Sequence, residues 1–133
     1  MRKVQKLNGL WEINLSNGKT LRSKILVNAS GPMILNSFKN VFQETSNYEI
    51  KHVQGSHIVT NKLYEGSHAY ILQQSDRRIV FIIPYLEKFS LIGTTELEVD
   101  SPFNPQITPE EESYLLGCVN NFSKHKISKD DIV

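Results

Sequence analysis

The side chain best suited to acid–base chemistry in this sequence is the imidazole of His57. It stands in the segment GSHIV, directly after Gly55 and Ser56, where an alternating strand pattern is interrupted. Of the four histidines His57 has the most site-like setting, although a lone histidine is more often a hydrogen-bonded structural residue than a catalyst. Ser56 is not a candidate nucleophile, because neighbours in sequence are not thereby neighbours in geometry.

The segment GTTE, residues 93–96, is a second candidate, and two interpretations of it stay open. It follows an apolar run and lacks the lysine of a Walker phosphate loop. We favour a strand kink with a solvated Glu96 over a ligand-facing turn, because glycine within a strand commonly marks such a kink.

Metal and cysteine chemistry are not indicated. His52 and His57 are five residues apart in a predicted strand region, so their side chains would point to opposite faces and could not share a zinc ion. The single cysteine, Cys118, lies on the apolar face of a predicted helix, which favours a place in the core.

Alternating strands must position these residues. The segment from Gly9 to Ala29 predicts a hairpin that turns at Asn17-Gly18, and its second strand continues through ILVNA as a buried strand that enters a tight loop at Gly31-Pro32. The apolar spacing from residue 32 to residue 42 predicts a short amphipathic helix.

The middle of the chain predicts an antiparallel meander of at least three strands. A strand broken at Gly55-Ser56 precedes a second hairpin, AYILQQ and IVFIIPY, and the segment SLIGTTELEV adds a further strand. The run 79–83 is apolar at every position, so we expect a central strand that is covered on both faces.

A capped helix follows the meander. Thr108 is the predicted N-cap, Pro109 the first helical residue, and Glu111 completes a capping box. Tyr114, Leu115, Cys118, Val119 and Phe122 form its apolar face. The apolar pair at the extreme C-terminus indicates a strand that has just begun.

Composition limits the class of protein. The chain has 133 residues, which suits one domain or part of one, and its formal charge of +1 comes from scattered residues, which does not suggest nucleic-acid binding. One cysteine cannot form an internal disulfide, so a reducing cytoplasm fits best. We find no export signal and no run of the ~20 apolar residues that a membrane-spanning helix needs.

Several blocks in one order give a more specific indication than any single motif. ILVNASGPM, VQGSHIV, the long run AYILQQSDRRIVFIIPYLEKFSLIGTTELE and the final helix together closely resemble the middle of the FAD-dependent glycerol-3-phosphate dehydrogenases, over about residues 9 to 133. The resemblance implies an α+β fold, an antiparallel sheet with flanking helices that forms the substrate-binding part of a two-domain FAD oxidoreductase. Such enzymes oxidise glycerol 3-phosphate to dihydroxyacetone phosphate and pass the electrons to quinone at the membrane.

The same resemblance implies roles for five residues. His57 matches the family histidine near the substrate and the reactive edge of the flavin, and Thr94 and Thr95 match a strand end close to that pocket. Ser30 and Gly31 match the strand end that approaches FAD. The chain would then be a single fragment, 1–133, in which about 1–45 borders the FAD domain and about 46–133 forms the substrate-domain sheet and the C-terminal helix.

The resemblance is incomplete. No Gly-x-Gly-x-x-Gly turn for the FAD pyrophosphate is present, and the family's later arginine and Gly-Gly-Lys segments are missing, so we expect no FAD binding and no activity from the chain alone. Met33, Gln54 and Glu96 replace a usual tryptophan, lysine and aspartate, which indicates relaxed constraint.

Three interpretations of the chain compete. We favour the remnant of a broken gene, and next one piece of a split enzyme whose partners are complementary fragments of the same enzyme. The third is a non-catalytic binding module for a partner or metabolite. Family members are peripheral at the membrane, but nothing in this segment supports membrane association, and we expect a cytoplasmic location.

Overall fold

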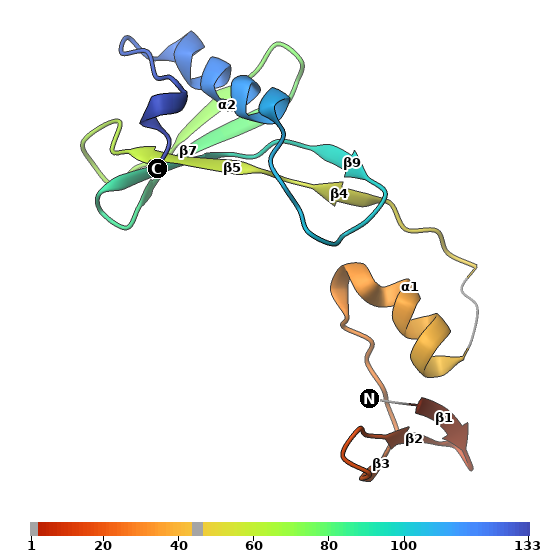
Figure 1. Ribbon diagram of the computed structural model, residues 1–133. Helices are drawn as coiled ribbons and strands as arrows, with labels where there is room; N and C mark the ends of the chain where they lie inside the picture. Colours follow the sequence, from red (N-terminus) through yellow and green to blue (C-terminus); the bar gives the residue numbers. More distant parts are fainter. Residues whose placement is uncertain (1–2, 44–46) are drawn as a thin grey trace. The chain divides into compact units, whose positions relative to one another are not determined.

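The computed structural model describes residues 3–43 and 47–133. It divides into two compact units, Met1–His52 and Val53–Val133, which are described separately below. The boundary expected from the sequence, at about residue 45, lies outside the described residues. Both units contain antiparallel sheets and helical segments, so the predicted α+β class is confirmed (Figure 1).

The first unit contains a three-stranded antiparallel sheet in the order β1-β2-β3. Its strands are β1 (Lys3–Leu7), β2 (Leu10–Asn14) and β3 (Thr20–Ser23). The predicted turn between β2 and β3 is confirmed, because Gly18 adopts a φ of +81° and donates its N–H to the carbonyl of Leu15 at 3.1 Å. Strand β1 was not predicted from the sequence.

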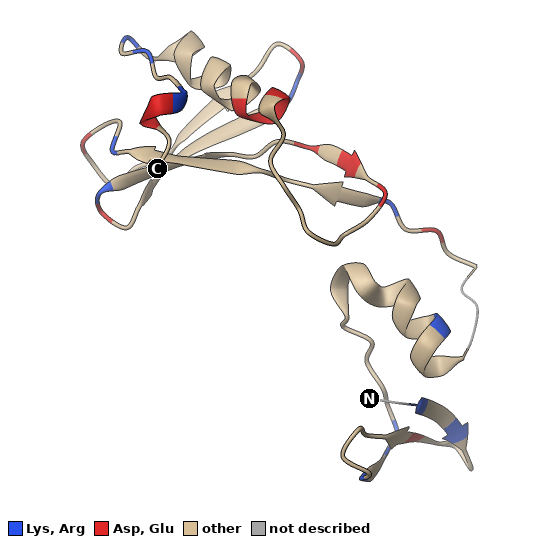
Figure 2. Cartoon of the chain, viewed as in Figure 1, with Lys and Arg blue, Asp and Glu red and all other residues tan. Residues whose placement is uncertain are grey.

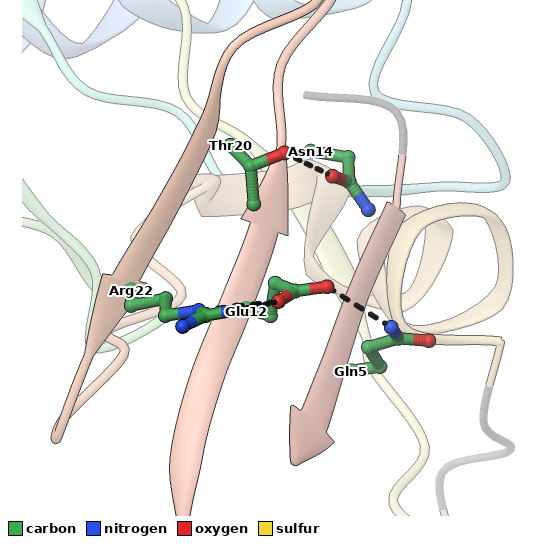
Figure 3. Close-up of polar contacts among 5 residues, drawn as sticks. All are labelled: Gln5, Glu12, Asn14, Thr20 and Arg22. Atoms are coloured by element: carbon green, nitrogen blue, oxygen red, sulfur yellow. Dashed lines mark hydrogen bonds and ion pairs between the residues drawn. The ribbon is translucent and has the colours of Figure 1, made fainter.

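Strand β1 owes its place to pairing with β2. Its residue Val4 is only 2% exposed and lies opposite Ile13, which is 7% exposed. The opposite face is polar: the Glu12 carboxylate accepts hydrogen bonds from Gln5 on β1, at 3.3 Å, and from Arg22 on β3, at 3.2 Å to Nη2 (Figure 3). One buried valine in five residues is too weak a pattern to identify a strand without its partner.

The predicted strand through residues 25–29 is wrong. This segment has no strand structure, and Ile25 and Val27 are 75% and 78% exposed. Within the described residues no strand pairs with the segment, so its apolar side chains have no neighbouring strand to pack beside.

The predicted helix at 32–42 is confirmed as one continuous helical segment. It begins as the 3-10 turn η1 (Gly31–Met33), continues as α1 (Ile34–Ser37) and ends as the π turn η2 (Phe38–Phe42). The rings of Phe42 and of Trp11 on β2 form a T-shaped pair, with 6.1 Å between the ring centroids. This aromatic contact joins the helical segment to the sheet of the first unit.

The second unit is built on a four-stranded antiparallel sheet in the order β5-β8-β7-β6, with a two-stranded sheet of β4 and β9. The strands are β4 (His52–Gln54), β5 (His57–Asn61), β6 (Tyr70–Gln73), β7 (Ile79–Tyr85), β8 (Phe89–Gly93) and β9 (Leu97–Val99). The strand break at Gly55-Ser56, the second hairpin and the meander are therefore confirmed. The segment SLIGTTELEV, expected as one strand, instead forms β8, which ends at Gly93, and β9, which pairs with β4.

Helix α2 (Pro109–Phe122) covers one face of this sheet (Figure 1). Its predicted capping box is present, with Thr108 as N-cap and Glu111 as the reciprocal partner. Glutamates in its first turn, red in Figure 2, also suit the positive end of the helix dipole. The core between helix and sheet consists of Ile58, Leu72, Val80, Ile82, Ile92, Leu115, Cys118 and Val119.

The expectation that β7 is covered on both faces is wrong. Val80 and Ile82 are buried under α2, whereas Phe81 and Ile83 on the other face are 37% and 39% exposed. We call this second face the outer face. By the strand register it carries Ile71, Gln73, Ile79, Phe81, Ile83, Tyr85, Phe89, Leu91, Gly93, His57, Val59 and Asn61.

The C-terminus forms one β-bridge rather than the expected strand. Ile132 bridges to Thr60, and the N–H of Val133 donates to the carbonyl of Val59 at 3.0 Å, directly after the 3-10 turn η3 (Lys129–Asp131). No helix among the described residues is long and apolar enough to cross a membrane.

Candidate functional site

The segments GSH and GTT meet at one end of the outer face. His57 is the first residue of β5 and lies opposite Gly93, the last residue of β8. The His57 ring rests on Gly93 so closely that a Cβ atom at that position would overlap the imidazole. The glycine therefore leaves the space that the exposed His57 ring occupies on the surface of the sheet.

Thr94 and Thr95 follow Gly93 but differ in their surroundings. Thr94 is exposed and packs against Gly55, where a Cβ would lie 2.5 Å from the Thr94 hydroxyl oxygen. Thr95 is only 4% exposed. Of the two threonines predicted to bind substrate, Thr94 is therefore the one with a side chain exposed to solvent. A role in substrate binding stays a prediction for both residues.

The Thr95 hydroxyl joins three parts of the second unit. It accepts the N–H of Ser56 at 2.8 Å and donates to the Glu111 carboxylate oxygen Oε1 at 2.5 Å. The N–H of Thr95 in turn donates to the carbonyl of Ser56 at 3.2 Å. The turn before β5, the turn after β8 and the start of α2 are thereby held together.

Glu111 is a member of this site that the sequence indicated only as a helix cap. Its second oxygen, Oε2, accepts the N–H of Thr108 at 2.9 Å. Burial acts to raise the pKa of this carboxyl group, but the hydrogen bonds from Thr95, Thr108 and the Ser56 side chain outweigh it, and the pKa lies below its ordinary value. The capping box uses one of the two carboxylate oxygens of Glu111. The other oxygen, which a cap leaves free for a further contact, was the only feature of the sequence that could have indicated this role.

Gln54 also has a structural contact at this site. Its amide nitrogen donates to the Ser56 hydroxyl at 3.2 Å and to the carbonyl of Gln106 at 2.7 Å. Gln54, at the position where the resemblance implies a lysine, therefore joins β4 to the loop before α2.

Ser30 and Gly31 belong to the first unit and sit at the start of its helical segment. The Asn28 side-chain oxygen accepts the Ser30 hydroxyl at 2.7 Å and the Ser30 N–H at 3.3 Å. The Asn28 amide nitrogen is buried without a hydrogen-bond partner. Gly31 has a φ of +55°, a conformation that favours glycine. The loop thus holds one buried amide donor that has no hydrogen-bond partner.

The remaining candidates have structural surroundings. The His52 ring contacts the carbonyl of Pro32 at 3.0 Å, and the His68 ring packs against Tyr64 and Tyr70. Cys118 is 2% exposed in the core, as predicted. Within residues 3–43 and 47–133 no three histidine, cysteine or acidic side chains are placed to hold a metal ion.

Comparisons with known proteins identify the family. Residues 2–132 match the family described as FAD dependent oxidoreductase. The chain is 45% identical over 135 residues to a glycerol-3-phosphate dehydrogenase of Pseudomonas aeruginosa, covering 98% of this chain and 26% of that protein. A D-erythritol 1-phosphate dehydrogenase of Brucella abortus is 33% identical over 132 residues, 95% of this chain and 26% of that protein.

A solved structure has the same fold. The X-ray structure of the glycerol-3-phosphate dehydrogenase from Bacillus halodurans, complexed with FAD, superposes with a TM-score of 0.65 at 24% identity, covering 98% of this chain and 28% of that one. The chain spans about a quarter of the length of the curated relatives it matches. The resemblance expected from the sequence blocks is confirmed, and the chain belongs to the family of FAD-dependent oxidoreductases.

Proposed function

We propose that this chain is the substrate-facing part of an FAD-dependent dehydrogenase that oxidises glycerol 3-phosphate to dihydroxyacetone phosphate. The observation that carries the proposal is the position of His57, whose ring lies exposed on Gly93 at the end of the outer face. The names of two relatives, a glycerol-3-phosphate and a D-erythritol 1-phosphate dehydrogenase, support a polyol phosphate as the class of substrate.

His57 accepts the proton of the substrate hydroxyl in this proposal. A neutral imidazole is a suitable base near pH 7, and the seat on Gly93 limits the orientations of the ring. Thr94 is exposed, and its hydroxyl, which donates to the carbonyl of Thr95 at 2.9 Å, keeps a lone pair that can accept a hydrogen bond from the substrate. FAD, when bound, supplies the acceptor for the hydride that leaves the substrate carbon.

The described residues offer a partial fit to FAD. The unpartnered amide nitrogen of Asn28 is the kind of donor that the oxygen-rich dinucleotide accepts, and Ser30 and Gly31 lie beside it. Holding the pyrophosphate requires a Gly-x-Gly-x-x-Gly turn, and Gly9, Gly18 and Gly31 do not have that spacing. We therefore propose that these 133 residues contact FAD but do not retain it on their own.

The outer face supports a second candidate, one piece of a split enzyme. Ile71, Phe81 and Ile83 leave apolar surface exposed beside His57, and such a surface suits a separate polypeptide that completes the site. In this candidate the complementary fragments carry the FAD-binding turn. A non-catalytic binding module would use the same surface without chemistry. A cytoplasmic location stays a proposal from the single cysteine.

A chimera tests the proposed function directly. The 135-residue matching region of the Pseudomonas aeruginosa relative is replaced with this chain, and the product is assayed for bound flavin and for glycerol 3-phosphate oxidation with an artificial acceptor. We expect flavin to be retained and the substrate to be oxidised. The His57→Gln chimera should retain flavin but lose at least about 100-fold in kcat, the usual contribution of a general base.

The control is His125→Gln, which changes an exposed histidine outside the site and should leave kcat unchanged. A chimera that binds flavin but oxidises nothing, even after Gln54→Lys, Met33→Trp and Glu96→Asp are introduced together, would overturn the proposal and favour a decayed remnant. Co-expression of the natural chain with its genomic neighbours tests the split enzyme, because activity should appear only in the co-expressed preparation.

A further inference from the structure

We propose that Glu111 is a positioning residue for His57, and that it acts through the hydroxyl of Thr95. This inference rests on the proposed function, in which His57 is the proton acceptor. The cap of α2 thereby gains a second role, which is to fix the backbone at the start of β5, from which the His57 side chain projects.

The direction of the hydrogen bonds is determined by the groups involved. An ionised carboxylate can only accept, so the single proton of the Thr95 hydroxyl is donated to Glu111 Oε1. The hydroxyl oxygen then has its lone pairs available for the N–H of Ser56, which donates to it at 2.8 Å. Glu111 therefore orients Thr95 as an acceptor for the backbone of the residue that precedes His57.

This arrangement exceeds what a helix cap requires. The cap uses only Glu111 Oε2, which accepts the N–H of Thr108. Oε1 is directed instead to Thr95, 16 residues earlier in the chain. Ser56, Thr95 and Glu111 are 8%, 4% and 7% exposed, so water cannot easily replace a hydrogen bond that is lost among them.

The contacts of the neighbouring residues carry the effect to the candidate site. Ser56 is bonded to His57, and Thr95 is bonded to Thr94, which packs against Gly55. A shift of either turn therefore moves a residue that lines the surface beside His57. The same hydrogen bonds lower the pKa of the Glu111 carboxyl, which favours the ionised form that accepts from Thr95.

The experiment measures hydrogen exchange of the Ser56 amide, at single-residue resolution, in the 133-residue chain without flavin or substrate, with the exposed Ile71 replaced by lysine in every sample to reduce association. Exchange at the Val80 amide, in the core strand β7, serves as the internal reference for global unfolding. Thr95→Val removes the acceptor of the Ser56 N–H and keeps the side-chain shape. Glu111→Gln retains one acceptor oxygen, which cannot serve both Thr95 and Thr108.

We expect Ser56 exchange relative to Val80 to be about fivefold faster in both variants, since a hydrogen bond of ordinary strength is lost. The NMR signal of the His57 ring should shift with it. Thr95→Ser keeps the hydroxyl and should restore both values. Two controls, Glu110→Gln in the same helical turn and Thr108→Ala at the cap, should change Ser56 and Val80 exchange by the same factor.

Unchanged Ser56 exchange and an unchanged His57 signal in Thr95→Val and Glu111→Gln would overturn the inference. So would a shift of equal size in the Thr108→Ala control, because the effect would then belong to the helix cap alone. These measurements do not depend on enzymatic activity. An inactive chimera would therefore overturn the proposed function but not the positioning role of Glu111, and unchanged Ser56 exchange would overturn the positioning role but not the proposed function.

Discussion

The imidazole of His57 and the backbone of Gly93 are in direct contact across β5 and β8, so closely that the ring occupies the space that a Cβ at Gly93 would need. The two residues lie in one cross-strand row with Phe81 of β7. The position of the His57 ring thus depends on Gly93, which lies 36 positions later in the chain and has no side chain, and on the strand register that brings the two residues together.

Gly93→Ala should displace the His57 ring and destabilise the fold. The added methyl group overlaps the imidazole, and forcing atoms into occupied space typically costs about 1–3 kcal/mol. Urea unfolding gives the loss of free energy, and the NMR signal of the His57 ring reports its displacement. A Gly93→Ala chain with both values unchanged would show that the ring is not held against this glycine.

Gly117→Ala is the matched substitution with the opposite expected sign. Apart from its chain neighbours and the backbone of its own helix, no atom lies within 4 Å of the position that a Cβ at Gly117 would occupy, and the residue is in the interior of α2. Replacing glycine with alanine in a helix should therefore raise the free energy of unfolding by about 0.5–1 kcal/mol. A lower free energy of unfolding for Gly117→Ala, measured by urea unfolding, would show that the space beside this residue is not open.

Leu115→Ala should remove much of the stability of the second unit. Leu115 is fully buried between α2 and the sheet, and truncation of such a side chain costs about 2–5 kcal/mol through lost burial and the cavity left behind. Phe122→Ala, on the same helix at a position 59% exposed, is the control and should cost less than about 1 kcal/mol. Thermal unfolding measures both variants, and an equal loss of stability in Leu115→Ala and Phe122→Ala would show that Leu115 is not part of the core.

Glu111 should make stability depend on acid pH. Its pKa in the folded chain lies below the ordinary value of 4.5, so the carboxylate contributes stability that is fully present above pH 4.5 and is lost as the pH falls through the folded value. At pH 6 the free energy of unfolding of the natural chain should be about 1–3 kcal/mol higher than that of the Glu111→Gln variant. Urea unfolding should show this difference narrowing below pH 4.5, and a difference constant with pH would exclude the ionised carboxylate as its source.

The outer face should promote association of the isolated chain. Ile71 is 65% exposed on the edge strand β6, and Phe81 and Ile83 continue the apolar surface across β7. We expect the chain to be marginally stable and to aggregate, and Ile71→Lys to reduce light scattering. Gln73→Lys adds the same charge to the same face and strand without removing an apolar side chain, so it should reduce light scattering less than Ile71→Lys does. A clean monomer of the natural chain with a sharp cooperative melt would contradict this prediction.

Local features were predictable because the residues that form them are close in the sequence. The Asn17-Gly18 turn and the Thr108 capping box depend on hydrogen bonds between residues only a few positions apart. Alternating apolar residues likewise predicted the meander of the second unit. The family resemblance could also be recognised from the sequence, since it rests on ordered blocks of residues and needs no coordinates.

Only the tertiary structure decided which faces are buried and which residues surround His57. The run 79–83 is apolar throughout, and sequence cannot say that α2 covers Val80 and Ile82 while Phe81 remains on the outer face. Nor could it place Glu111 beside Thr95, because a side-chain hydrogen bond across 16 residues depends on how the helix packs on the sheet. Local sequence determined turns and caps through short-range bonds, whereas burial and the site depend on packing between distant segments.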